Sequence, residues 1–135
     1  MIKNFPSLIF PEFKYLERLN KLDVITSQSN FDKKTLLAVL LIDETNNHEY
    51  FSHKYNVSNE LKENLNLIAK NFINLQKNKK FFLQDLKKNI YFFGKIHLMA
   101  LNTLYFSSSK KVKLKDYLNV LNNIKKLEIK DVEYI

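Results

Sequence analysis

Cysteine and the residues that break helices are scarce in this chain of 135 residues, which contains one glycine, two prolines and no cysteine. An all-β protein needs glycine or proline at many tight turns, so the composition favours long helices joined by short loops. The lack of cysteine excludes disulfides and thiolate metal sites, and it is consistent with a reducing compartment. We therefore expect a cytoplasmic protein with an all-α fold.

Long apolar runs are missing as well. The longest one, Leu36–Ile42, is too short to span a bilayer. The first ten residues carry one lysine and no long apolar run, which is unlike a secretory signal peptide. We expect neither a membrane span nor a membrane partner.

Catalytic motifs are a third absence. A phosphate-binding loop needs several glycines for close backbone approach, and the lone Gly94 cannot supply them. The chain has no D-x-D carboxylate pair for two-metal nucleotidyl transfer. Ser107–Ser109 lack the G-x-S-x-G turn of a serine hydrolase. We therefore predict no catalytic residue in this chain and no activity when it is alone.

The three histidines do not suggest a metal site. His48 and His53 are five residues apart, whereas two ligands on one helix face need a spacing of three or four. We expect these two to be surface histidines. His97 lies in an apolar segment and is expected to be a core or groove histidine. No metal or cofactor is predicted to bind this chain.

Apolar residues make up 45% of the sequence, enough for a folded core, and they recur at helical spacing. The chain is predicted to form a single helical domain, residues 1–135, folded as a compact bundle of about six to seven helices. The expected helices run from about Glu12 to Leu22, Lys33 to Ile42, His48 to Tyr55, Asn59 to Gln76, Phe82 to Phe93, Ile96 to Phe106 and Leu114 to Lys126.

Three features refine this prediction. The second helix is apolar nearly all round, which is typical of a helix in the centre of a core. Gly94 interrupts an otherwise helical pattern, so it marks either a kink or a close approach of another helix. Residues 127–135 end on hydrophobic side chains without a stop signal, which suggests a chain cut before its natural end.

The segment Phe51–Leu65 is expected to be the hub of the bundle. Ser58 is a good N-cap because its hydroxyl can accept from a free N–H of the first helical turn, and Glu60 favours the positive end of the helix dipole. The helix that follows presents one apolar stripe at helical spacing, made of Leu61, Leu65, Ile68, Phe72 and Leu75.

Positive charge is the main functional lead. The 22 Lys and Arg residues against 14 Asp and Glu give a net charge of +8, which favours a polyanionic partner. Arg18 is the only arginine, and the abundance of Lys, Asn and Ile also suits an AT-rich genome. The candidate RNA-binding residues are Lys77, Lys79 and Lys80 at one expected junction, Lys87 and Lys88 on the next helix, and Lys110, Lys111, Lys113 and Lys115 at a later junction.

These lysines fit two interpretations. If both junctions lie on one side of the bundle, they form a surface that follows a phosphate backbone and binds it in a salt-dependent way. The alternative is that they belong to ordinary solvated loops. Five aromatic residues could stack on bases, although aromatics at helical spacing are more often core residues: Tyr91, Phe92, Phe93, Tyr105 and Phe106.

Four stretches, in the same order along the chain, resemble the helical body region of bacterial CCA-adding tRNA nucleotidyltransferases, within the poly(A) polymerase family. The most diagnostic is Lys54–Leu61, KYNVSNEL, followed by a charged helix with leucines. The other three are IFPEF with the LERL that follows at Ile9–Leu19, LLAVLL at Leu36–Leu41 and IYFFGK at Ile90–Lys95. Together these similarities cover the chain from about Ile9 to Leu127.

The resemblance implies a function that this chain would perform only in part. The family adds C, C and A to tRNA 3′ ends with CTP, ATP and Mg²⁺, through a catalytic head and a nucleotide-reading neck whose motifs are absent here. The resemblance therefore implies a body-region fragment, with its C-terminal tail also truncated, that holds tRNA by its backbone and works with a head and neck in cis or in trans. A standalone helical protein-interaction module, with an apolar groove around Tyr91–Phe93, is the alternative.

Overall fold

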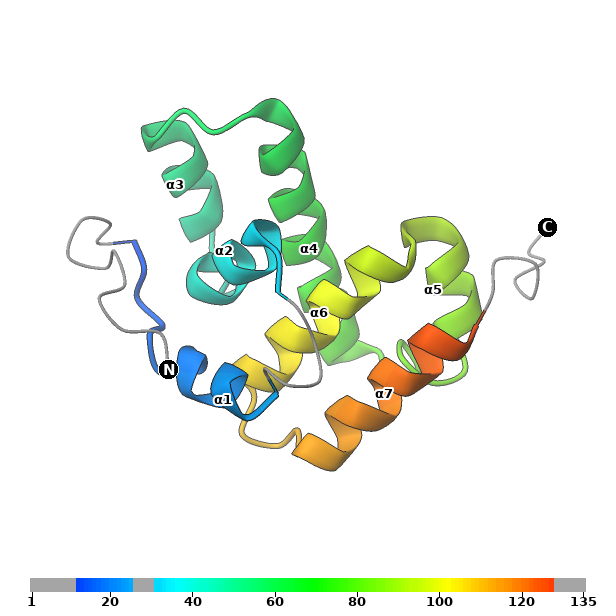
Figure 1. Ribbon diagram of the computed structural model, residues 1–135. Coiled ribbons are helices and arrows are strands. Elements are labelled where there is room, and N and C mark those ends of the chain that lie inside the picture. Colours follow the sequence, from blue (N-terminus) through cyan, green and yellow to red (C-terminus); the bar gives the residue numbers. More distant parts are fainter. Residues whose placement is uncertain (1–11, 26–30, 128–135) are drawn as a thin grey trace.

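The computed structural model describes residues 12–25 and 31–127. These residues contain seven helices and no strand (Figure 1). This confirms the predicted all-α bundle. The helices are α1 (Arg18–Ile25), α2 (Lys33–Leu41), α3 (Asn47–Lys54), α4 (Asn59–Lys77), α5 (Leu86–Phe93), α6 (Lys95–Ser108) and α7 (Leu114–Lys126).

The central helix is α6. It packs against α1, α2, α4, α5 and α7, and it crosses the middle of the molecule in Figure 1. Nine of its 14 residues are buried. The expectation that Phe51–Leu65 forms the hub is therefore wrong, because α3 packs only on α2 and α4 among the closely packed helix pairs. Helix α2 does belong to the core as predicted, since the side chains of residues 38–42 are fully buried.

The link between α3 and α4 is built from two local capping motifs. Asn56 has a φ of 51°, and the N–H groups of Asn56 and Val57 donate to the carbonyls of His53 and Ser52 at 3.4 and 3.1 Å. This is the Schellman arrangement, in which a left-handed residue ends a helix. Ser58 then accepts a hydrogen bond from the Leu61 N–H at 3.2 Å, which confirms the predicted N-cap. The stripe on α4 points into the core, with its first leucine half-buried.

Replacing Ser58 by alanine should lower the free energy of unfolding by about 1 kcal/mol, because one N–H of the first turn of α4 loses its acceptor. Urea unfolding of the two proteins measures the difference. Ser58→Asp is the matched control, since aspartate caps equally well and should retain wild-type stability. A Ser58→Ala protein with wild-type stability would contradict this role of the hydroxyl.

Gly94 separates α5 from α6 as a change of direction. Its φ of +83° lies in the region that favours glycine, and its N–H ends α5 by donating to the Ile90 carbonyl at 2.8 Å. A Cβ added there would meet nothing within 4 Å. Of the two alternatives, the kink is therefore correct, and the close approach of another helix is not.

Two predicted helix starts are wrong. The first helix begins at Arg18 rather than at Glu12, because residues 12–17 are irregular apart from short turns, and the polar groups of Glu12 bind elsewhere. The Glu12 carbonyl accepts from the Asn47 side chain at 3.1 Å, and its carboxylate contacts Lys54 at 3.0 Å. Helix α5 begins at Leu86 rather than at Phe82, after a series of turns that buries Phe81 and Phe82 and exposes Leu83.

The other boundaries follow local signals. Three residues before α2 could cap it by their side-chain oxygens, Ser29, Asn30 and Asp32. Asp32 does so by accepting from the Thr35 N–H at 2.8 Å, and the other two lie outside the described residues. Helix α7 runs from Leu114 to Lys126 as predicted. The prediction for the end of the chain after Leu127 concerns residues that the structure does not describe.

Candidate nucleic-acid interface

Net positive charge is concentrated in two short helix junctions. Residues 77–88, between α4 and α5, contain five lysines and one aspartate, which gives +4. Residues 110–116, between α6 and α7, contain four lysines and one aspartate, which gives +3. These stretches carry seven of the eight net charges, because the other 13 basic residues are nearly balanced by 12 acidic ones. The nine lysines of the sequence prediction are the ones in these junctions.

The α4–α5 junction surrounds a surface pocket of about 350 Å³. Lys77, in the last turn of α4, and Lys88, in the first turn of α5, both line it. A lysine in the last turn of a helix also complements the helix dipole, which explains locally why Lys77 is there. Lys79, Lys80 and Lys87 are exposed. They are close in sequence to residues that line this pocket, but they do not line it themselves.

Side-chain amides form the polar wall of this pocket. Asn78 donates to the Asp85 carboxylate at 3.1 Å, and Asn89 donates to the Phe81 carbonyl at 2.9 Å. The amide nitrogen of Asn71 lies 3.0 Å from Nε2 of the buried His97. These bonds fix the end of α4 against the starts of α5 and α6, so the backbones that carry Lys77 and Lys88 are held at a defined separation.

His97 is a core histidine, as predicted. It is 7% exposed, its ring packs against Phe93 at a centroid distance of 5.4 Å, and burial lowers its pKa to about 4. A proton on Nε2 would face the amide nitrogen of Asn71, which is also a donor. Burial and this neighbour therefore favour the neutral ring in the folded protein.

Acidification from pH 7 to pH 4 should destabilise the fold through His97 by about 2–3 kcal/mol. The pKa is near 6.5 in the unfolded chain and about 4 in the folded one, so the unfolded state binds the proton first and stability falls with pH across this window. Urea unfolding at several pH values measures this loss.

The variant Asn71→Leu/His97→Leu removes both partners and should flatten the pH dependence, while the exposed His53→Gln control should keep it. Some dependence will remain from His48, since burial lowers its pKa too. Equal slopes in all three proteins would contradict this role of His97.

The loop between α6 and α7 lines one part of a larger pocket of about 610 Å³. Lys110 and Lys111 line it from the loop after α6, together with Arg18 and with Asp43 and Glu44 from the loop after α2. The loop is held by Lys21, whose ammonium donates to the carbonyls of Phe106 and Ser109 at 3.0 and 2.6 Å. Lys113 and Lys115 are exposed at the start of α7 and do not line the pocket.

The two pockets lie on either side of the end of α4. Phe72 and Gln76 line the larger pocket, whereas Asn74 and Lys77 line the smaller one. The last two turns of α4 thus connect the two lysine groups that the sequence analysis placed at separate junctions. Of the nine predicted lysines, Lys77 and Lys88 are brought to one pocket, and Lys110 and Lys111 are brought to the other.

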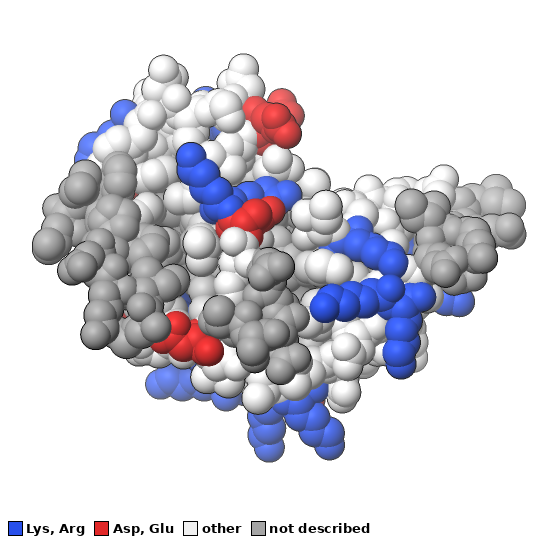
Figure 2. All heavy atoms as spheres, in the orientation of Figure 1, with Lys and Arg blue, Asp and Glu red and all other residues white. Residues whose placement is uncertain are grey.

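A third basic group, missed by the sequence analysis, lies where α7 ends. Lys95 donates to the Lys125 carbonyl at 3.2 Å, which joins the start of α6 to the last turn of α7 and its Lys126. Figure 2 shows one face of the molecule, on which basic side chains predominate over α7, while the visible acidic side chains lie over the α1–α4 part. Only the two adjacent lysines at 125 and 126 signalled this group in the sequence.

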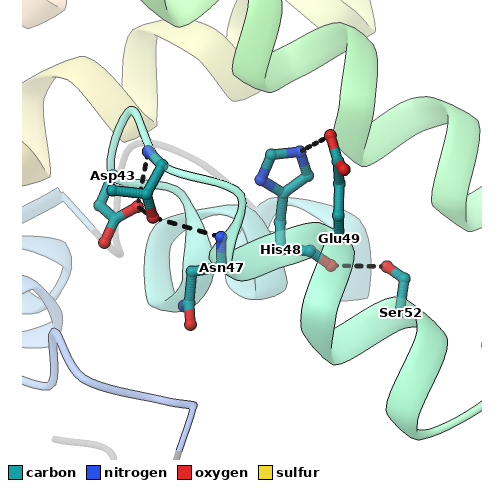
Figure 3. A network of polar contacts seen from close by, with 6 residues as sticks. Asp43, Asn47, His48, Glu49 and Ser52 are labelled. Carbon is teal, nitrogen blue, oxygen red and sulfur yellow. Dashed lines mark hydrogen bonds and ion pairs between the residues drawn. The ribbon is translucent and has the colours of Figure 1, made fainter.

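His48 departs from the surface position that was expected. It is 4% exposed, and its Nε2 lies 3.9 Å from the Glu49 carboxylate (Figure 3). Its carbonyl accepts from the Ser52 hydroxyl at 2.8 Å, and Nδ1 has no hydrogen-bond partner among the described residues. The ring is buried because it lies in the first turn of α3 and meets Asn66 on α4. His53 is exposed, as expected.

The described residues contain neither a cluster of metal-ligating side chains nor a membrane-spanning helix. Within residues 12–25 and 31–127, no three His, Cys, Asp or Glu side chains come together as metal ligands. Across the same residues, every helix is too short or too polar to cross a bilayer. No family model, no curated protein and no solved structure matches the chain.

Proposed function

We propose that this chain is an RNA-binding helical domain that holds the phosphate backbone of tRNA through its lysine-bearing junctions. The observation that carries the proposal is the concentration of seven of the eight net charges in residues 77–88 and 110–116, on either side of the end of α4. Lysines placed in this way neutralise phosphates without reading bases, so the binding is independent of sequence.

The choice of tRNA rests on the resemblance to the body region of CCA-adding tRNA nucleotidyltransferases. Two stretches of that resemblance coincide with helix boundaries: KYNVSNEL spans the α3–α4 link, and IYFFGK spans the bend at Gly94. In this proposal the domain presents tRNA to a catalytic head and neck, in cis or in trans. CTP, ATP and Mg²⁺ would bind that head and neck rather than this chain, which is inactive alone.

Fluorescence anisotropy with labelled tRNA at increasing salt tests the proposal. We expect dissociation constants in the micromolar range at low salt. We also expect log affinity to fall linearly with log salt concentration, with a slope of about −0.7 to −0.9 for each phosphate neutralised. Binding that does not depend on salt, or no binding at low salt, would rule the proposal out.

One observation favours a second candidate, a protein-interaction module. Tyr91, Phe92 and Ile96 are 52%, 57% and 67% exposed around the bend between α5 and α6, although large apolar side chains usually avoid such positions. A protein partner that docks there would bind at high salt and would be indifferent to added tRNA. Competition between tRNA and a protein captured through this surface therefore separates the two candidates.

A further inference from the structure

Helix α5 has an unusual outward face. Its inward residues, Leu86, Asn89 and Ile90, are buried. The opposite face would ordinarily be polar on a helix at the surface of a bundle. In α5 this face combines two lysines with two exposed aromatic residues: Lys87, Lys88, Tyr91 and Phe92.

The spacing pairs each ring with an ammonium group. Lys87 precedes Tyr91 by four residues, and Lys88 precedes Phe92 by four, so each lysine lies one helical turn from an aromatic ring. Neither lysine forms an ion pair with another described residue. Lys88 also lines the smaller pocket together with Lys77. The positive track of the α4–α5 junction therefore continues to the aromatic face.

The two rings hold each other in place. Tyr91 and Phe92 meet edge to face, with centroids 5.5 Å apart and an interplanar angle of 78°. Phe92 also contacts Phe93 at 6.4 Å, and Phe93 packs on the buried His97. Rings that are both exposed and supported in this way lose little further freedom when a planar ligand stacks on them.

We propose that the outward face of α5 is a stacking platform for unpaired nucleotides, with base rings on Tyr91 and Phe92 and the neighbouring phosphates on Lys87 and Lys88. Exposed aromatic rings beside a basic track are the combination that binds single-stranded nucleic acid. The basic surroundings select a polyanion as the occupant, and RNA supplies planar rings as well as negative charge. The inference rests on the proposed RNA-binding function and adds a preference for single-stranded segments.

Tyr50 provides a matched control elsewhere on the molecule. It is 59% exposed on α3 and also has a lysine at a spacing of four, Lys54, whose ammonium lies 5.9 Å from its ring. Lys54, however, is bound to the Glu12 carboxylate at 3.0 Å. The same ring-and-lysine pair therefore lacks a free positive charge at this position.

The chain contains no tryptophan, so a single introduced indole reports on one site. We expect short oligoadenylate to quench the emission of the Phe92→Trp protein, and to quench it more strongly than its duplex with oligouridylate does. The Tyr50→Trp protein should show little quenching with either ligand. Equal quenching of both reporters, or equal quenching by the single strand and the duplex, would overturn the platform.

Affinity measurements with the Tyr91→Leu/Phe92→Leu variant complete the test. Leucine keeps the face apolar but removes the rings, so oligoadenylate binding should weaken about tenfold while duplex binding changes less than about twofold. Unchanged oligoadenylate binding would overturn the platform alone, provided that the four-lysine variant (Lys77, Lys88, Lys110 and Lys111 to Gln) still loses RNA. If the lysine variant loses nothing, the proposed function fails instead.

Sedimentation of the wild-type protein tests whether a second copy of the chain covers the outward face of α5. The stacking proposal expects a monomer whose face is available to RNA. A dimer that oligoadenylate does not dissociate would assign this face to a second copy of the chain and would also overturn the platform.

Discussion

Replacing Lys77, Lys88, Lys110 and Lys111 together by glutamine should weaken tRNA binding about a hundredfold at roughly 0.1 M salt. These four line the two pockets beside the end of α4. Each lysine–phosphate contact that is lost reduces the salt slope by about 1, which corresponds to as much as about tenfold in affinity at this salt concentration. Anisotropy titrations of both proteins give the affinities and the slopes.

A second fourfold variant separates site from net charge. Lys14, Lys33, Lys62 and Lys70 lie outside both pockets, and their replacement by glutamine lowers the net charge from +8 to +4, as the first variant does. We expect this control to lose less than about fivefold, through weaker long-range attraction alone. Similar losses in the two variants would mean that RNA responds to total charge and not to this surface.

Arg18→Met should lower the free energy of unfolding by about 3 kcal/mol. The guanidinium is buried and donates to the carbonyls of Val39 and Ile42 at 2.9 and 2.6 Å. Helix α2 ends at Leu41, so no N–H group of a following helical turn donates to the Val39 carbonyl. This carbonyl therefore depends on Arg18 as its donor. Methionine keeps the apolar stem and leaves both carbonyls buried without a donor. Urea unfolding measures the loss.

Arg18→Lys is the control for charge. Lysine restores a positive charge near the negative end of α2, but a single ammonium does not reproduce the planar guanidinium that also lies 4.2 Å from the Tyr15 ring. We expect it to recover about half of the lost stability. A loss below about 1 kcal/mol for Arg18→Met would show that water or a backbone shift satisfies the two carbonyls.

The parts of the fold that could be predicted depend on neighbours in sequence. The Ser58 cap, the Asp32 cap and the bounds of α7 follow from residues within one helical turn. The false start at Glu12 has the opposite cause. The carboxylate and carbonyl of Glu12 bind Lys54, Tyr55 and Asn47, which are 35 to 43 residues away and leave no trace in the local pattern.

The sequence predicts which lysines belong to the candidate site, but it does not predict how they are arranged in space. The lysine clusters are visible in the sequence, but only the tertiary structure shows that the end of α4 lies between them. Tyr91 and Phe92 illustrate the same limit. They carry a helical apolar pattern with Ile90, yet α5 buries Asn89 in their place because its amide donates to the Phe81 carbonyl. The local sequence pattern does not show which of these residues is buried.

Lysine footprinting shows which ammonium groups tRNA covers. Brief acylation of the wild-type protein with and without tRNA, read out by mass spectrometry, reports the protection of each ammonium group. We expect tRNA to protect Lys77, Lys88, Lys110 and Lys111, whereas Lys14, Lys33 and Lys70 should react equally in both samples. Protection of the second group, or equal protection of both groups, would contradict the assignment of the lysine junctions as the RNA-binding surface.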